Sequence, residues 1–239
     1  MFEIYVYPSY DEMSRKAAEV VLETLQKKEV VLGLATGSSP VGLYQNLVKA
    51  HQQGQSFKHV TTVNLDEYVG IDQHHSQSYY TFMQENLFKH VDIPSSQIYI
   101  PTGVGALSKV TQDYEDLLKK HPQDLQVLGI GSNGHIGFNE PGTSFDSTCH
   151  VVELKQQTIE DNARFFPSIN DVPTQAITMG IQDILRAKKI VLLASGEKKA
   201  KAIFEMIHGA ITEEVPCTIL QKHPHVIVIV DEAAGKDLT

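Results

Sequence analysis

Hydrophobic and polar positions alternate in blocks along this chain. Three short, apolar, β-branched runs have the length and composition of strands that are covered on both faces, namely VVLGLA (30–35), VTTVNL (60–65) and LQVLGI (125–130). Further apolar runs read FEIYVY, QIYI, AITMG, KKIVLLAS, VPCTIL and HVIVIV, and stretches of helical periodicity separate many of them. Because parallel neighbours need a crossover connection, the pattern predicts an α/β fold with a mostly parallel sheet and helices on both faces.

Capping signals mark where several helices begin. Ser9 and Glu12 form a capping-box pattern before a helix that extends to about residue 27, and Ser39, followed by Pro40, is the predicted N-cap of the next. Other helices are expected at about 78–88, 108–120 and 197–208. From 142 to 175 the periodicity weakens. Long loops in compact domains are usually functional or disordered, so this segment is predicted to be either an active-site lid or a surface excursion.

Each of the three β-branched runs is followed at once by polar, glycine-containing sequence: ATGSSP, DEYVG and GSNGH. In an open α/β sheet, ligands bind beyond the carboxyl ends of the strands. We therefore expect 36–39, Asp66 and His135 to meet in one cleft, and the chain to be an enzyme.

Composition narrows this picture. The 239 residues, 41% hydrophobic, are enough for one α/β domain over 1–239 without a linker. The net charge is −9 with scattered Lys and Arg, which argues against nucleic-acid binding. Cys149 and Cys217 form no CxxC, so neither a disulfide framework nor a zinc site is expected, and the cytoplasm is the predicted location. No signal peptide is apparent, and no run reaches the ~18 apolar residues of a membrane span.

The ATGSSP loop is a candidate anion site. The helix that is expected to begin after Ser39 leaves several free backbone N–H groups aimed at the loop of Thr36, Gly37, Ser38 and Ser39, and the helix dipole adds partial positive charge there. The loop lacks the GxxxxGK[ST] spacing, so a nucleoside triphosphate is not implied. An ordinary capped turn is the alternative.

GIGSNGHIGF contains a formal GxGxxG, with Glu153 about 20 residues further on. A dinucleotide site needs a helix immediately after the glycines, and the sequence from Asn139 to Gly142 breaks any helix there. The cofactor interpretation is therefore rejected. The glycines instead let the backbone curl so that His135 points inward.

Acid/base side chains stand in both remaining loops. His135 can shuttle a proton at neutral pH, with Glu140 fixing its tautomer. Asp66 is a candidate general base, although spacing alone does not tell whether Asp66 or Glu67 points into the cleft, and either could simply face water. The sequence has no HExxH and no clustered Cys/His set, so no metal is expected, and GxSxG is missing too.

Five stretches together resemble the glucosamine-6-phosphate deaminases: FKHVTTVNLDEYVG, QSYYTFM, GSNGHIGFNEP, NARFF and ILQKHP. The resemblance spans nearly the whole chain. It implies a three-layer α/β/α, modified Rossmann-like fold shared with sugar-phosphate isomerases and lactonases. It also implies conversion of glucosamine 6-phosphate to fructose 6-phosphate and ammonia, in amino-sugar catabolism, without a cofactor.

The resemblance assigns roles to matching positions. Asp66 would move a proton between C2 and C1, His135 would assist ring opening, and Glu140 would support His135. Asn133 is counted with these catalytic residues, and Glu67 and Gly134 are expected beside them in the active site. The phosphate-binding positions would be Thr36, Gly37, Ser38, Ser39, Arg164 and Lys199. Several family members have Asp where this chain has Asn133, and an asparagine can orient a neighbour but cannot accept a proton.

Regulation is predicted to be absent. Larger bacterial members have a longer C-terminus and an allosteric site for N-acetylglucosamine 6-phosphate, lined by basic residues shortly after NEP, where this chain has His150 and Val152. We therefore expect a short, non-allosteric enzyme with hyperbolic kinetics, a monomer or a low-order homo-oligomer, with only the small-molecule substrate as partner. Two alternatives are a 6-phosphogluconolactonase on the same fold and a sugar-phosphate-sensing domain, which would normally accompany a DNA-binding module.

Overall fold

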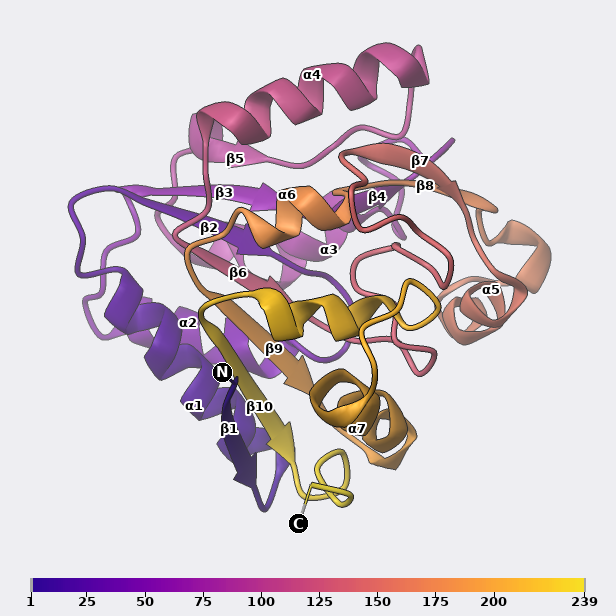
Figure 1. Ribbon diagram of the computed structural model, residues 1–239. Helices are drawn as coiled ribbons and strands as arrows, with labels where there is room; N and C mark the ends of the chain where they lie inside the picture. The colour runs from indigo at the N-terminus through magenta and orange to yellow at the C-terminus, as the bar shows by residue number, and fades with distance from the viewer. Residues whose placement is uncertain (1, 239) are drawn as a thin grey trace.

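A computed structural model describes residues 2–238, without the side chains at 157, 161 and 165. Its main sheet has seven strands in the order β1-β10-β9-β6-β2-β3-β5, and every neighbouring pair is parallel. The strands are β1 (Phe2–Tyr7), β2 (Val30–Leu34), β3 (Val60–Asn64), β5 (Ile98–Tyr99), β6 (Leu125–Leu128), β9 (Ile190–Ala194) and β10 (Val226–Asp231). The predicted parallel α/β sheet is confirmed (Figure 1).

Helices cover both faces of this sheet, which gives the predicted three layers. They are α1 (Tyr10–Thr24), α2 (Val41–Gln52), α3 (Tyr79–Asn86), α4 (Leu107–Lys120), α5 (Gln156–Asn162), α6 (Ile181–Leu185) and α7 (Ala200–His208). In Figure 1, α1 and α2 pack together on one side, whereas α6 crosses in front of the strands. All residues of β9 and β10 are buried, as a strand covered on both faces requires.

The start of α2 corrects one prediction. Ser39 is not the N-cap: α2 begins at Val41, the Pro40 carbonyl accepts the Tyr44 N–H at 3.0 Å, and no side chain of the cap residue contributes. Instead, the hydroxyl of Tyr10, from α1, accepts the Gly42 N–H at 2.8 Å and donates to the Ser38 carbonyl at 2.9 Å. A side chain from another helix therefore replaces the local cap.

The first helix follows its capping box more closely. Ser9 Oγ accepts the Glu12 N–H at 3.3 Å, as predicted. The helix ends at Thr24 rather than near 27, and Lys27 instead pairs with Asp124 at 3.0 Å.

The segment 142–175 is more regular than the sequence indicated. It contains β7 (His150–Glu153) and α5, and β7 pairs antiparallel with β8 (Gln175–Thr178). The DEY motif is itself a strand, β4 (Asp66–Tyr68), on the other edge of β8, so a separate three-stranded sheet lies beside the main one. AITMG thus joins this small sheet, and VPCTIL becomes part of a 3₁₀ helix, Pro216–Lys222. Four-residue strands are too short to show a period.

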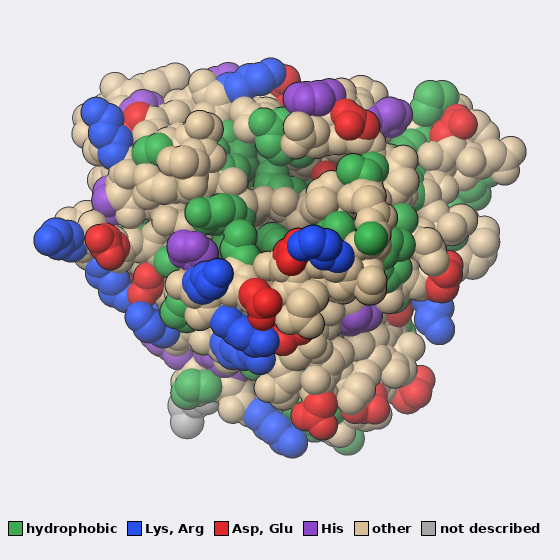
Figure 2. All heavy atoms as spheres, turned by 90° about the horizontal axis from the view of Figure 1, so that it is seen from above, with side chains coloured by type: hydrophobic (Ala, Val, Ile, Leu, Met, Phe, Trp, Pro, Cys, Tyr) green, Lys and Arg blue, Asp and Glu red, His purple; other side chains and the backbone are tan. Residues whose placement is uncertain are grey.

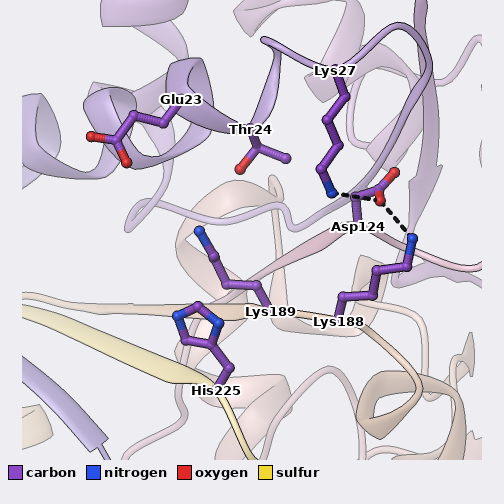
Figure 3. A pocket seen from close by; sticks show the side chains of 7 residues that line it. All are labelled: Glu23, Thr24, Lys27, Asp124, Lys188, Lys189 and His225. Atoms are coloured by element: carbon purple, nitrogen blue, oxygen red, sulfur yellow. Dashed lines mark hydrogen bonds and ion pairs between the residues drawn. The ribbon is translucent and has the colours of Figure 1, made fainter.

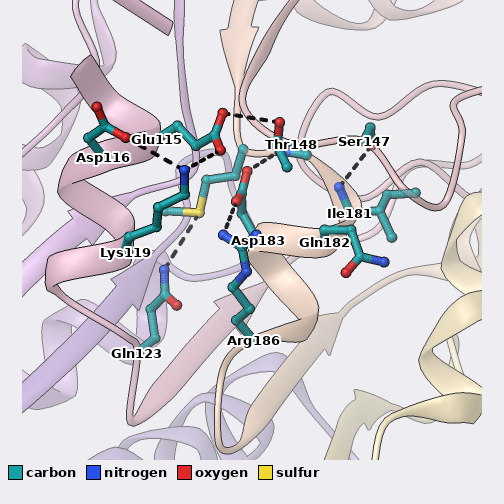
Figure 4. A network of polar contacts seen from close by, with 12 residues as sticks. Glu115, Asp116, Lys119, Gln123, Ser147, Thr148, Ile181, Gln182, Asp183 and Arg186 are labelled. Carbon is teal, nitrogen blue, oxygen red and sulfur yellow. Dashed lines mark hydrogen bonds and ion pairs between the residues drawn. The ribbon is translucent and has the colours of Figure 1, made fainter. Parts of the chain in front are cut away.

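A buried polar network fixes the end of β8 (Figure 4). The Asp183 side chain, 0% exposed, accepts the Gly180 N–H at 3.0 Å and pairs with Arg186 at 2.8 Å. Ser147 Oγ accepts the Ile181 N–H at 3.0 Å. Because Gly180 lies two residues after Thr178, these contacts hold in place the strand that pairs with Asp66.

The opposite edge of the sheet carries its own charged cluster. A cavity of about 260 Å³ lies at the amino ends of the strands, lined by Glu23, Thr24, Lys27, Asp124, Lys188, Lys189 and His225 (Figure 3). Asp124 accepts the Val31 N–H at 3.0 Å and the ammonium groups of Lys27 and Lys188 at 3.0 and 2.9 Å. Burial opposes ionisation of Asp124, but these donors outweigh it and lower its pKa.

Asp124→Ala should lower the free energy of unfolding at neutral pH by about 1–3 kcal/mol, because the Val31 N–H loses its acceptor. A carboxyl whose pKa is lower in the folded state stabilises above its unfolded pKa of about 4 and loses that contribution as pH falls further. The difference from the wild type, measured by urea unfolding, should therefore shrink in acid. Asp113→Ala, at a side chain 62% exposed, is the control and should change stability by less than about 0.5 kcal/mol.

Candidate active site

The loops that follow β2, β3 and β6 meet at the carboxyl edge of the main sheet. The strand β2 lies between β3 and β6, and the chain continues outward from them in opposite directions, which makes this a topological switch point. A Cβ at Gly137 would lie 3.6 Å from Asp66 Oδ2, so the GSNGHIG loop passes directly over the aspartate. Burial raises the pKa of Tyr79, the nearby charge of Asp66 adds to this effect, and a side-chain hydrogen bond with Thr36 opposes it, so Tyr79 links the first loop to the same place.

Asp66 is the buried acid of this edge. It is 6% exposed and opposes Thr178 in the small sheet. Burial, with a smaller contribution from the neighbouring Glu67, raises the pKa of Asp66 to about 8. A carboxyl with such a pKa takes up and releases a proton near neutral pH, which suits a general base.

Glu67 points elsewhere. Its Oε1 accepts the N–H groups of Tyr68 and Tyr79 at 2.9 and 3.0 Å, and its Oε2 accepts that of Tyr80 at 3.1 Å. The carboxylate therefore anchors the start of α3. No hydrogen bond to the Asp66 side chain is formed by the described part of the chain, which excludes the side chains at 157, 161 and 165. The pair that spacing could not separate thus divides into an anchor and a candidate base.

The loop after β6 joins His135, Asn133 and Glu140. His135 Nδ1 lies 3.5 Å from Glu140 Oε2, within reach of an ion pair but longer than a good hydrogen bond. Catalytic hydrogen bonds are often this long before substrate binds. Asn133 Oδ1 accepts the His135 backbone N–H at 3.1 Å, and Asn133 Nδ2 donates to Glu140 Oε2 at 2.9 Å. The asparagine therefore orients both partners without carrying a proton.

Two glycines make this loop possible. A Cβ at Gly131 would lie 2.4 Å from the His135 ring, so only glycine leaves room for the imidazole. Gly134 has φ +84°, a conformation that L side chains rarely adopt.

Glu140 is ionised in spite of its burial. It is 2% exposed, and burial opposes its charge, but the proximity and charge of His135, together with hydrogen bonds from Thr158 and Asn133, lower its pKa to about 2. A permanent carboxylate beside Nδ1 favours the tautomer that leaves Nε2 free to accept a proton.

The predicted phosphate positions lie on elements of the same edge. Thr36 to Ser39 follow β2, with Ser38 exposed, and Lys199 is the half-buried N-cap of α7, which follows β9. Arg164 is exposed in the 3₁₀ turn Ala163–Phe165 after α5. Their convergence on one phosphate stays a prediction. Figure 2 shows Lys, Arg, Asp and Glu interleaved on the visible face, without a broad field of one sign.

Gly37→Ala tests the phosphate loop. Gly37 has φ +87° with open space around it, so alanine adds about 1–2 kcal/mol of backbone strain without a clash. We expect KM for the sugar phosphate to rise about tenfold, from the loss of one charge-assisted hydrogen bond, with kcat nearly unchanged. Gly54→Ala, at φ +105° and equally open at the other end of α2, should cost similar stability and leave KM unchanged. Equal KM values in the two variants would contradict a phosphate role.

Sequence reasoning missed several contacts of this site. Thr158 donates to Glu140 Oε1, Thr178 Oγ1 accepts the Phe138 N–H at 3.1 Å, and Asn139 Nδ2 donates to the carbonyls of Ile136 and Met179. The NEP motif contains Asn139, so the sequence could have indicated this residue. No local pattern marks the two threonines, because they reach the site through the small sheet and α5.

The described residues were also compared with the requirements of a metal site and of a membrane-spanning helix. Within 2–238, no three His, Cys, Asp or Glu side chains are grouped so as to hold a metal ion. No described helix is both long and apolar enough to cross a membrane.

Comparisons with known proteins show the family. A family model described as glucosamine-6-phosphate isomerases/6-phosphogluconolactonase matches residues 8–228. A glucosamine-6-phosphate deaminase of Oceanobacillus iheyensis is 52% identical over 235 residues, covering 97% of this chain and 94% of that protein. Another, from Streptococcus thermophilus, is 52% identical over 228 residues, covering 95% of this chain and 96% of that protein.

Solved structures show the same fold. One described as a monomeric glucosamine-6-phosphate deaminase superposes with a TM-score of 0.96 at 45% identity, covering 98% of this chain and 99% of that one. A 6-phosphogluconolactonase from Leishmania guyanensis has a TM-score of 0.82 at 21% identity, covering 100% and 99%, which shows a shared fold alone. The chain therefore belongs to the glucosamine-6-phosphate isomerase/6-phosphogluconolactonase family, and within it to the glucosamine-6-phosphate deaminases.

Proposed function

We propose that this chain converts glucosamine 6-phosphate and water into fructose 6-phosphate and ammonia. The observation that carries the proposal is the buried Asp66, whose pKa is raised to about 8, beneath a loop that presents the His135–Glu140 pair. Relatives named for this activity share about half of its residues over nearly its full length.

The reaction needs two proton transfers between neighbouring carbons. After the sugar ring opens, Asp66 takes the C2 proton while the substrate's ammonium group gives a proton to the C1 oxygen, which leaves an enolamine with a hydroxyl at C1 and a neutral amine at C2. The protonated carboxyl then returns a proton to C1, and the resulting C2 imine is hydrolysed by water, releasing ammonia. One carboxyl on one face of the substrate serves both transfers, and a positioned base of this kind contributes about 10²–10⁴-fold.

His135 and Glu140 assist the opening of the sugar ring. His135, held by Glu140, accepts a proton from the C1 hydroxyl and helps deliver one to the ring oxygen. The phosphate, bound by Thr36 to Ser39 with Arg164 and Lys199, anchors the far end of the substrate so that C1 and C2 lie over Asp66.

We also propose that the chain acts as a monomer in the cytoplasm and folds as one domain, with a lid within 142–175. The 3₁₀ turn that carries Arg164 is followed by Phe166, which packs edge-on against Tyr68 at 5.7 Å, so phosphate binding and seating of this segment would be coupled. A monomeric solved deaminase supports the first point, and two buried free cysteines suit a reducing compartment. Light scattering would test the oligomeric state.

An assay of both products tests the activity. Purified protein incubated with glucosamine 6-phosphate should release ammonia and fructose 6-phosphate in equal amounts. Hydrolysis of 6-phosphogluconolactone with no ammonia release would instead assign the second function found on this fold. Tight binding of glucosamine 6-phosphate without turnover would indicate a sensor. A hyperbolic rate curve, unaffected by N-acetylglucosamine 6-phosphate, is expected.

A further inference from the structure

Thr158 connects the segment 142–175 directly to the acid/base pair. It is the third residue of α5, is 4% exposed, and its hydroxyl donates a hydrogen bond to Glu140 Oε1. The two residues lie 18 positions apart in the sequence. None of the motifs that predicted the site includes this threonine.

Three side chains contact the carboxylate of Glu140, two at one oxygen and one at the other. Oε2 accepts from Asn133 Nδ2 at 2.9 Å and faces His135 Nδ1 at 3.5 Å, whereas Oε1 accepts from Thr158. A carboxylate is free to turn about its last bond, and a buried oxygen without a donor is costly. The hydroxyl therefore fixes the plane of the carboxylate, so that one oxygen faces the imidazole while the other accepts from Thr158.

The position of Thr158 depends in turn on how α5 is seated. A small apolar cluster holds this region against the DEY strand: Tyr68, Ile71, Phe138, Leu154, Phe166, Val172 and Ala176, with Ile159 and Ala163 packed on it. Phe166, just after α5, lies edge-on to Tyr68 at 5.7 Å. This cluster is separate from the main core of the protein.

We propose that Thr158 is a positioning residue, which orients Glu140 toward His135 only when α5 is seated on this cluster. The inference rests on the proposed deaminase function. When α5 packs on this cluster, it therefore orients Glu140 toward His135 in addition to its proposed role in covering the substrate. Thr158 contacts neither substrate nor reacting atoms in this role, so its removal should act on turnover and not on binding.

Thr158→Val tests the hydroxyl at nearly constant volume. We expect kcat to fall by about ten- to hundredfold, with KM changed less than about twofold, because one buried charge-assisted hydrogen bond is lost. Thr158→Ser retains the hydroxyl and should restore kcat to within about threefold of the wild type. Thr158→Ala, with high helix propensity, carries the same test if the valine variant does not fold.

The matched control is Thr24→Val. Thr24 is 7% exposed and donates to the Val20 carbonyl at 3.1 Å on α1, so the same substitution removes a buried hydrogen bond, here to a neutral acceptor, at the opposite edge of the sheet. It should lower the thermal unfolding temperature and leave kcat unchanged.

A second measurement does not depend on activity. The ¹⁵N shifts of the His135 ring report which nitrogen carries the proton, and we expect the Nδ1–H tautomer to be less populated in Thr158→Val than in the wild type. If the wild type releases no ammonia, the proposed function fails, whereas this tautomer difference still tests the positioning role. Unchanged kcat with an unchanged tautomer in the valine variant, an effect on KM alone, or equal losses in the valine and serine variants would overturn the proposal.

Discussion

Asp66→Asn should lower kcat by about 10²–10⁴-fold, the usual contribution of a positioned base. Asparagine has nearly the same shape, so the fold and the affinity for a sugar phosphate should be kept, because the phosphate is held elsewhere. Steady-state kinetics with glucosamine 6-phosphate and a binding titration measure the two effects. Asp72→Asn, at an exposed position four residues after β4, is the control and should keep wild-type turnover.

Asp66→Asn should also stabilise the folded protein, by an amount that depends on pH. The pKa of Asp66 is about 8 in the folded protein and about 4 when unfolded, so between these values the folded state binds more protons. The free energy of unfolding of the wild type therefore decreases as pH rises through this window. Asparagine does not titrate, so the variant does not lose stability in this way. The variant should unfold at a higher temperature than the wild type, with a gap that widens up to about pH 8, while wild-type kcat/KM rises over the same range. Retained turnover, or a variant less stable at pH 8, would count against a buried catalytic carboxyl.

Glu140→Gln is expected to reduce kcat by about 10²-fold or more. The amide lacks the charge that favours a protonated imidazole, and it presents an N–H₂ group toward Asn133 Nδ2 or Thr158, both of which now donate to the carboxylate. Inhibition by an unreactive sugar phosphate should be unchanged, because Glu140 lies away from the predicted phosphate loop. Glu153→Gln, at an exposed glutamate of β7, serves as the control. A kcat within threefold of the wild type would remove Glu140 from the mechanism.

The sequence predicted correctly those elements that depend on interactions between residues close together in the chain. The β-branched runs became the central parallel strands because they are buried on both faces, and Ser9 capped α1 because its partner Glu12 is only three residues away. The cap of α2 was wrong because Tyr10, 32 positions from Gly42, supplies it. A capping side chain that lies so far away in the sequence cannot be recognised from a window of a few residues.

The candidate site shows the same division. Asp66, His135, Asn133 and Glu140 became candidates because they follow strand ends within short motifs, and their catalytic roles stay a prediction. The hydrogen bonds that Glu67 accepts from the start of α3, which separate it from Asp66, could be seen only in the structure. The small antiparallel sheet and Thr158 were missed. Their placement depends on cross-strand pairing and on a second apolar cluster, and neither gives a period that can be read along the chain.

A crystal structure of the protein with an unreactive, ring-opened amino-alditol 6-phosphate tests the central claim most directly. We predict that one Asp66 carboxylate oxygen lies about 3–3.5 Å from both C1 and C2 of the ligand, with the phosphate in the loop 36–39. An Asp66 side chain turned away from these carbons, or another acid in its place, would contradict the account.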